Sequence, residues 1–286
     1  MGDRGLDDPP RRRRVAPLSP SLIPEGLDAT LVLVRHGETA DIVEHRFQGQ
    51  RPTPLSALGR RQAALAGVRL SRPHDPPPLP VPSGPPALIV HSSLTRCTET
   101  AIAIAAAMAA GESFGQAPEL LSLDGLRELN QGAWEGLTHD EIVHRYGTEL
   151  AAWRRRPAEA NAPDGESLAD ADGRLRPSLS TLLARLAEDR APGTIDRSQV
   201  PGSRDPVADH PWTVLVGHDG IFKLALLALF DLPLERFWWI TFPLAGITIV
   251  ELRAGRPVLR AHGLMDHLAP LATELASLEE DRGGAL

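Results

Sequence analysis

The 286-residue chain is predicted to fold as an α/β protein, a three-layer sandwich in which a mostly parallel sheet is flanked by helices. The first observation is a set of three short apolar runs, at 31–34, 87–90 and 213–216, which suit strands buried on both faces. The second is that each run is followed by a polar turn and then by a helical pattern. This alternation is typical of parallel strands that are joined through helices.

The first helices carry start and stop signals. Ser56 is a suitable N-cap for the helical pattern GRRQAALAGVRL, which comes shortly after it. The alanine-rich segment 94–110 is predicted to be a helix that ends at Gly111. One helix therefore follows each of the first two strands.

The second half of the chain is predicted to hold further helices and a strand pair. Thr138 and Glu141 form a capping box ahead of a short helix, which Gly147 is expected to stop. A longer helix should start near Ser167, and Pro177 should kink or divide it. Near the C-terminus, GITIVEL and PVLRAHG are expected to pair as closing strands.

One domain, residues 29–270, is expected to hold all of these elements. Residues 1–28 are interpreted as a flexible N-terminal tail and residues 271–286 as a C-terminal tail. Two proline-rich or polar insertions, 71–86 and 191–211, each precede a strand, which should place them at the N-terminal edge of the sheet. Ligands of such sheets bind beyond the C-terminal ends of the strands, so both insertions should be remote from the site.

Composition limits the kinds of partner. The formal net charge of −7 argues against electrostatic binding to nucleic acid, which needs a basic face. No stretch reaches the ~18 uninterrupted apolar residues of a membrane span, and prolines interrupt the head, so no signal peptide or membrane anchor is expected. Cys97 is the single cysteine, which excludes an intramolecular disulfide framework and predicts a reducing compartment, the cytoplasm. We expect Cys97 to be a small buried residue.

Polar residues cluster where the three apolar runs end, in LVLVRHGET, LIVHSSLTR and VLVGHDG. Parallel strands bring their C-terminal ends to one edge of a sheet. The residues expected to converge there are Arg35, His36, Arg96 and His218, and Glu128 could join them from an intervening loop. Each alone has an ordinary alternative as a turn residue, a salt-bridged arginine or a surface carboxylate. Two arginines and two histidines at one rim favour a phosphate pocket, because a guanidinium fork matches phosphate oxygens and helix N-termini after the two histidines would add N–H donors.

The predicted pocket contains a nucleophile and an acid. His36 can attack phosphorus only when its imidazole is neutral, which is accessible because the pKa of histidine is ~6.5, and its second nitrogen should donate to a backbone carbonyl. The leaving alkoxide needs a proton, and Glu128 is the available acid; a bound phosphate dianion would raise its pKa above ~4.3. No HExxH motif occurs, and His139 and His144 are five residues apart, so no metal and no other cofactor is expected.

Six ordered segments carry a family resemblance over residues 31 to 250: LVLVRHGET, RFQGQ with PLSALGRRQA, HSSLTRCTETA, LRELNQGAWEG, PDGESLADADGRL and LVGHDG. Together they resemble the histidine phosphatase superfamily, also called phosphoglycerate mutase-like. The resemblance implies a phosphoglycerate mutase-like fold in which His36 becomes phosphorylated and Glu128 donates the proton. It also implies that Arg35, Arg96 and His218 complete the phosphate pocket.

A second set lies near the substrate by the same resemblance: Gln48, Gly49, Asp219 and Gly220. Arg46 could supply a third guanidinium or form a structural salt bridge. Two residues depart from the family pattern. Ile42 stands where an asparagine often touches the phosphoryl group, and Pro52 stands where the family often has aspartate. These departures concern the leaving-group preference and not the nucleophile or its acid.

The segment after Glu128 separates phosphatases from mutases in this family. Mutases typically continue with a run resembling ERHYG and a long insertion, whereas this chain has ELNQGAWEG and a shorter stretch. We therefore predict a phosphomonoesterase that hydrolyses a small phosphorylated metabolite through a phosphohistidine on His36. Mutase-type phosphoryl transfer and a non-enzymatic protein that binds phosphorylated ligands are the alternatives.

Two expectations concern surfaces of the domain. Trp134 is interpreted as lining the pocket mouth, and Trp238 and Trp239 as core or subunit-interface residues. A homodimer is expected from the family resemblance alone.

Overall fold

One six-stranded sheet forms the centre of the computed structural model, which describes residues 21–188 and 210–271. The strand order is β3-β2-β4-β1-β5-β6. Neighbours among the first four strands run parallel, whereas β5 is antiparallel to β1 and to β6. The sheet is therefore mostly parallel, as predicted, and the closing strand pair is confirmed. The strands are β1 (Ala29–Arg35), β2 (Leu88–Ser92), β3 (Glu119–Leu123), β4 (Trp212–Gly217), β5 (Ile247–Arg253) and β6 (Arg256–Leu264).

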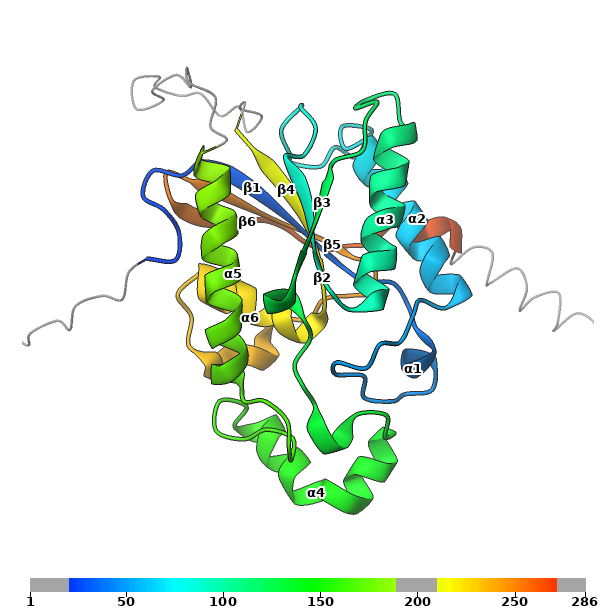
Figure 1. Cartoon of the computed structure of the whole chain (residues 1–286), viewed down its shortest axis with the longest axis vertical. Coiled ribbons are helices and arrows are strands. Elements are labelled where there is room, and N and C mark those ends of the chain that lie inside the picture. The colour runs from blue at the N-terminus through cyan, green and yellow to red at the C-terminus, as the bar shows by residue number, and fades with distance from the viewer. Residues whose placement is uncertain (1–20, 189–209, 272–286) are drawn as a thin grey trace, which may run out of the picture.

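Helices cover both faces of this sheet (Figure 1), which confirms the three-layer sandwich. On one face lie α2 (Ala57–Ser71) and α3 (Thr95–Ala110), and on the other lie α5 (Leu168–Glu188) and α6 (Asp219–Leu229). Successive side chains of a strand point to opposite faces, so an apolar run can fill two cores. In β1, Leu31 and Leu33 pack in the α5 and α6 core, whereas Val32 and Val34 pack in the α2 and α3 core.

Helix α4 (His139–Arg155) begins at the predicted capping box but continues beyond its predicted end. The Thr138 hydroxyl accepts from the Glu141 N–H, and the Glu141 carboxylate accepts from the Thr138 N–H. The chain leaves helical angles at Tyr146 (φ −136°, ψ 30°) and then resumes the helix. A glycine inside a helix costs only about 1 kcal/mol relative to alanine, so burial of Trp153 further along can offset it. The first helical segment therefore ends beside Gly147, where the stop was predicted, and a second segment that the sequence did not predict continues to Arg155.

Helix α5 is a single helix that contains Pro177, so of the two alternatives, that Pro177 kinks the helix or divides it, division was wrong and a kink stays a prediction. Proline removes the hydrogen bond to the carbonyl four residues earlier, at Gly173. Both residues are exposed, so water can bind that carbonyl. The predicted starts of α2 and α3 and the end of α3 at Gly111 are confirmed.

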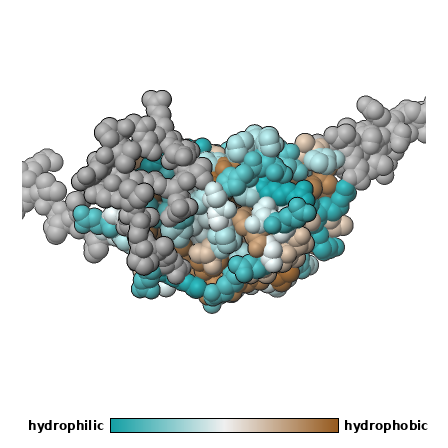
Figure 2. Space-filling view, turned by 90° about the horizontal axis from the view of Figure 1, so that it is seen from above, coloured by the Kyte–Doolittle hydropathy of each residue, from teal (hydrophilic) through white to brown (hydrophobic). Residues whose placement is uncertain are grey.

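The two ends of the sheet differ. Insertion 71–86 lies at the N-terminal ends of the parallel strands, where the Trp212 Nε1–H donates to the Gly84 carbonyl (2.8 Å), and α1 (Ala40–Val43) and α4 lie at the opposite end (Figure 1). Seen from above, hydrophilic and hydrophobic residues are interspersed across that first end (Figure 2). Residues 21–28, assigned to the tail from the sequence, pack on the domain because Ile23 and Leu27 are buried. Nearly all of insertion 191–211, the rest of the N-terminal tail and residues 272–286 lie outside the described residues.

Candidate active site

Arg96 connects the histidines that follow two neighbouring strands. It lies in the first turn of α3, directly after β2, and its side chain is fully buried. Its Nε–H points to both Nε2 of His36, which follows β1, and Nδ1 of His218, which follows β4; each distance is 3.2 Å. The two imidazole rings lie edge to face with centroids 5.1 Å apart. The predicted convergence of strand ends is therefore present.

The hydrogen bonds of His36 determine its tautomer. Nδ1 lies 2.7 Å from the carbonyl oxygen of Gly37, which can only accept, so Nδ1 carries the hydrogen. Nε2 faces the donor Arg96 and therefore carries a lone pair. Burial, followed by the charges of Arg96 and Arg35, holds the pKa of His36 well below its ordinary value of 6.5. The imidazole is thus neutral at physiological pH, with Nε2 able to act as a nucleophile.

His218 has the opposite tautomer. Its Nδ1 accepts from Arg96, so Nε2 carries the hydrogen and donates to the hydroxyl of Ser92 at 2.8 Å. Burial and the neighbouring charge of Arg96 hold the pKa of His218 well below 6.5. Ser92 ends β2 and is fully buried, and the sequence reasoning did not single it out. Its position in HSSLTR, four residues before Arg96, was the available signal.

Two glycines allow the chain to pass closely beside His36. A Cβ on Gly37 would lie 2.4 Å from the carbonyl oxygen of Gly59, and a Cβ on Gly59 would lie 2.0 Å from the carbonyl oxygen of Glu38. Both contacts are with backbone, which cannot move aside easily. The first turn of α2 therefore packs directly against the backbone of Gly37 and Glu38, next to His36.

Arg35, the last residue of β1, has one fixed and one unsatisfied donor group. A terminal N–H donates to the Phe242 carbonyl at 2.6 Å. The Nε atom is buried and has no hydrogen-bond partner among the described residues. An unpaired buried donor costs about 1–3 kcal/mol, which an anionic ligand beside it would relieve. Arg35 therefore keeps one donor that is not used within the described residues, and its binding of a phosphate stays a prediction.

Glu128 faces the N-terminus of α6. Its carboxylate accepts from the N–H groups of Leu129 (3.0 Å), Gly220 (3.1 Å) and Ile221 (3.0 Å). Burial raises the pKa of Glu128 above its ordinary value of 4.5, and the charge of Asp219 raises it further. The side chain can therefore hold a proton at a higher pH than an exposed glutamate.

The N-terminus of α6 donates to a carboxylate, whereas donation by helix N-termini to a bound phosphate stays a prediction. After His36, the chain enters only the four-residue helix α1, which starts at Ala40. After His218, the N–H groups of Gly220 and Ile221 bind Glu128.

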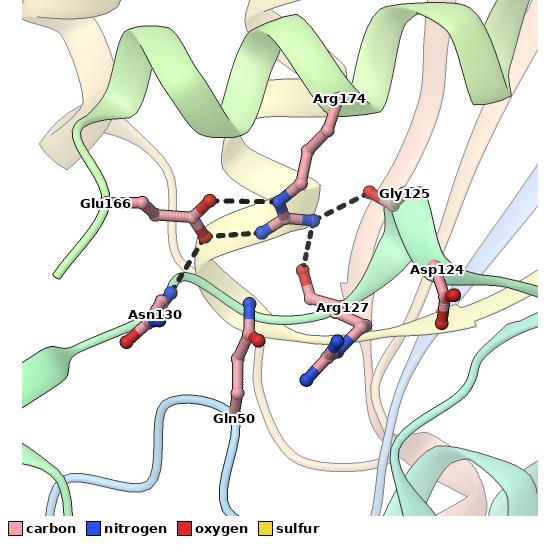
Figure 3. Close-up of a pocket in the computed structure, with 7 residues that line it drawn as sticks. All are labelled: Gln50, Asp124, Gly125, Arg127, Asn130, Glu166 and Arg174. Atoms are coloured by element: carbon pink, nitrogen blue, oxygen red, sulfur yellow. Dashed lines mark hydrogen bonds and ion pairs between the residues drawn. The ribbon is translucent and has the colours of Figure 1, made fainter.

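Arg174 holds the segment that carries Glu128, beside a cavity of about 370 Å³ (Figure 3). Its guanidinium donates to the carbonyls of Gly125 (3.0 Å), Arg127 (2.9 Å) and Glu128 (3.0 Å), and it pairs with Glu166 at 2.5 Å. Gln50 donates to the same Glu128 carbonyl at 2.9 Å. PDGES is one of the family motifs of the chain, but the sequence alone indicates no role for Glu166. In the structure, Glu166 of this motif is the carboxylate that pairs with Arg174.

Arg96 also fixes the loop that carries part of the second predicted set. Its two terminal nitrogens donate to the carbonyls of Gly49 (2.8 Å) and Arg51 (2.9 Å). Gly49 has φ +49°, and a Cβ there would lie 2.1 Å from the Glu135 carboxylate. A side chain here would displace Glu135 and strain the backbone, which favours glycine in this turn. The loop and the buried guanidinium therefore hold each other in place.

The remaining members of that set are engaged within the protein. The Gln48 amide donates to the Thr39 hydroxyl. The Arg46 guanidinium binds Glu44 (2.8 Å) and the Gly136 carbonyl (2.8 Å), which corresponds to the salt-bridge alternative. Asp219 accepts from the Phe242 N–H and pairs with Lys223. Contact of these residues with a substrate stays a prediction.

The structure also settles several secondary expectations. Trp134 is fully buried against Phe47 and Trp153, so its assignment to the pocket mouth was wrong. Trp239 is 66% exposed and is not a core residue. Cys97 is buried as expected, and burial raises the pKa of its thiol to about 12.

Residues 21–188 and 210–271 contain no cluster of three or more histidine, cysteine, aspartate or glutamate side chains that could hold a metal ion. None of the helices in these ranges combines the length and apolar character needed to cross a bilayer.

Comparison with known proteins identifies the family. Residues 31–192 and 200–264 match the model of the histidine phosphatase superfamily (branch 1). A glucosyl-3-phosphoglycerate phosphatase of Mycolicibacterium vanbaalenii is 33% identical over 223 residues, which span 78% of this chain and 83% of that protein. Phosphoserine phosphatase 1 of Hydrogenobacter thermophilus is 26% identical over 85% of this chain and 96% of its own length.

A solved structure agrees with this assignment. The native structure of a mycobacterial glucosyl-3-phosphoglycerate phosphatase superposes with a TM-score of 0.65 at 29% identity, covering 84% of this chain and all of the other. The family match spans both the fold and the strand ends that carry Arg35, Arg96 and His218. The chain therefore belongs to branch 1 of the histidine phosphatase superfamily.

Proposed function

We propose that the protein is a metal-independent phosphomonoesterase that works through a phosphohistidine on His36. The observation that carries the proposal is the state of this side chain. Its imidazole is neutral, its Nε2 lone pair faces Arg96, and Arg35 ends the preceding strand with a buried Nε–H that has no partner among the described residues. A phosphoryl group bound between the two guanidiniums would present its phosphorus to Nε2.

In the first step, Nε2 of His36 attacks phosphorus and the bond from phosphorus to the leaving alkoxide oxygen breaks. Arg35 and Arg96 neutralise charge on the non-bridging oxygens. Glu128 gives its proton to the alkoxide, and its raised pKa favours the protonated form that this step needs. The Glu128 carboxylate left behind is stabilised by the Gly220 and Ile221 N–H groups.

In the second step, Glu128 takes a proton from water as the water oxygen attacks the phosphohistidine. The bond between phosphorus and Nε2 breaks, which regenerates neutral His36, protonated Glu128 and free phosphate. We propose that His218 acts as a donor to the phosphoryl oxygens. To donate from Nδ1, the neutral imidazole must carry its hydrogen on Nδ1 instead of Nε2. The Ser92 hydroxyl, 2.8 Å from Nε2, permits this change because it can donate to Nε2 as well as accept from it.

Hydrolysis is favoured over mutase-type transfer. The segment ELNQGAWEG lacks the basic and aromatic run of the mutases, and the phosphatases named above match over most of this chain. A purely ligand-binding role is disfavoured because a nucleophile with a lowered pKa and an acid with a raised pKa are both present.

For the substrate, we propose a small phosphomonoester whose alcohol part carries a carboxylate. Two relatives act, by their names, on glucosyl-3-phosphoglycerate and phosphoserine, which share that feature. Phosphoserine and phosphoethanolamine form a matched pair that differs by this carboxylate. In a screen of phosphorylated metabolites, we expect faster turnover of phosphoserine than of phosphoethanolamine.

We also propose that the protein works in the cytoplasm and forms a homodimer.

The direct test is hydrolysis of p-nitrophenyl phosphate by the purified protein. We expect turnover that persists in EDTA and that is abolished by His36→Ala. His144→Ala removes an exposed histidine on α4 and serves as the matched control, with unchanged activity. Activity that survives in His36→Ala would overturn the assignment of the nucleophile. No turnover of any phosphomonoester by the wild-type protein would overturn the proposed function.

A further inference from the structure

An ion pair between a buried lysine and a partly exposed aspartate lies on α6, directly after His218. Lys223, on α6, is only 3% exposed, and its Nζ lies 2.5 Å from one carboxylate oxygen of Asp219. The same Nζ lies 5.1 Å from the ring centroid of Phe237 and 4.9 Å from that of Trp238. A cation is withdrawn from water at large cost unless a partner compensates for it. Lys223 and Asp219 therefore hold each other in a fixed orientation.

The second carboxylate oxygen of Asp219 binds the chain ahead of β5. It accepts from the Phe242 N–H at 2.8 Å. The Phe242 side chain is buried and packs against the rings of Phe222 (centroids 5.3 Å apart) and His262 (5.2 Å). Backbone and side chain of Phe242 are thus both fixed.

The carbonyl of Phe242 binds the candidate phosphate ligand Arg35 at 2.6 Å. A continuous series of contacts therefore runs from Lys223 through Asp219 and Phe242 to the Arg35 guanidinium. With one terminal nitrogen held in this way, the guanidinium can turn only within narrow limits. A guanidinium held ready loses less side-chain entropy when it binds a phosphate.

We propose that Lys223, Asp219 and Phe242 form a strut that fixes Arg35 against the phosphoryl site. Asp219 is then a positioning residue that acts through Arg35, and not a substrate ligand as the family resemblance implies. This inference rests on the proposed function, in which Arg35 binds the phosphoryl oxygens. It assigns a role to Lys223, a buried cation that the catalytic steps do not use.

The test is a double-mutant cycle on the binding of inorganic phosphate, measured by isothermal titration calorimetry without any turnover. The four proteins are the wild type, Arg35→Ala, Asp219→Ala and the double variant. We expect each single substitution to weaken binding about 5- to 30-fold, a factor that corresponds to about 1–2 kcal/mol. The double variant should bind no more weakly than Arg35→Ala, because Asp219 has no remaining route to the ligand.

Two further variants keep the test decisive if Asp219→Ala does not fold. Asp219→Asn retains an oxygen for the Phe242 N–H but loses the charge that faces Lys223, so its binding should be intermediate. Lys223→Met should weaken phosphate binding although the Lys223 side chain is buried. This effect should also vanish in the Arg35→Ala background. Glu159→Ala removes a carboxylate from an exposed ion pair with Arg156 and should bind phosphate as the wild type does.

Additive losses in the double variant would overturn the strut, because they would mean that Asp219 reaches the ligand independently. Unchanged binding in both Asp219→Asn and Lys223→Met would overturn it as well. Failure of the proposed function gives a different result, in which the wild type neither binds phosphate nor turns over any phosphomonoester.

Discussion

Replacement of Arg96 by lysine keeps the positive charge but removes the guanidinium fork. Arg96 points donors at four acceptors: His36, His218 and the carbonyls of Gly49 and Arg51. The ammonium group of a lysine carries all of its donors on one nitrogen. It cannot reach all four acceptors, which lie on different sides of the Arg96 guanidinium. Loss of one fixed donor to developing charge costs about 2.7–4 kcal/mol, so kcat/KM should fall about 10²- to 10³-fold.

The same substitution should weaken the fold. Two hydrogen bonds from a charged donor to the carbonyls of Gly49 and Arg51 contribute about 1.5–3 kcal/mol each. If the ammonium keeps one of them, the free energy of unfolding should decrease by about 1.5–3 kcal/mol. A buried carbonyl without a donor accounts for that loss.

Both effects are measured with p-nitrophenyl phosphate kinetics and urea unfolding. Arg176→Lys is the matched control, since Arg176 pairs with Asp172 on the outer side of α5 and its side chain is 44% exposed. A kcat/KM for Arg96→Lys equal to that of the control would refute the reasoning that places Arg96 at the centre of the phosphate pocket.

Two other predictions concern protonation. Burial lowers the pKa of His36 and His218 well below 6.5, so below pH 6.5 the unfolded chain binds more protons than the folded protein. The free energy of unfolding should therefore decrease as the pH is lowered, by up to about 1.4 kcal/mol per histidine per pH unit. In urea unfolding, His218→Gln should show a shallower slope of this free energy against pH, and a slope identical to that of the wild type would contradict the neutral state of His218. Glu128 has the opposite sign, because its raised pKa contributes stability below pH 4.5 that is lost as the pH rises through its folded pKa. In single-turnover measurements, Glu128→Gln should slow transfer of the phosphoryl group from alkyl phosphates to His36 about 10²- to 10⁴-fold but transfer from p-nitrophenyl phosphate much less, since nitrophenolate leaves without a proton. Equal losses in this step for both substrates would argue against Glu128 as the proton donor.

The central strands and the convergence at their ends were predictable because they follow from strong local patterns. Continuous apolar runs mark strands that are buried on both faces, and β1 and β4 are of this kind. Once these strands are parallel, His36 and His218 must lie at the same edge. β3 was missed because it is an edge strand whose residues are exposed or half-buried, so it carries no apolar run.

What the sequence could not reveal depends on contacts between distant segments. Nothing local to Asp219 shows that its carboxylate binds the N–H of Phe242, and nothing local to Glu166 shows that it pairs with Arg174. The second helical segment of α4 was missed for a related reason, since burial of Trp153 favours helix beyond Gly147. Tertiary packing decided each of these points.

The central claim is that His36 carries the phosphoryl group during turnover. Glu128→Gln should slow hydrolysis of the phosphoenzyme, so this variant is mixed with p-nitrophenyl phosphate, quenched in base and analysed by intact and peptide mass spectrometry. We predict one added phosphoryl group on His36 that is labile in acid, and none when His36→Ala is combined with Glu128→Gln. Turnover with no phosphoryl group bound to the protein, or a phosphoryl group that persists without His36, would contradict the account.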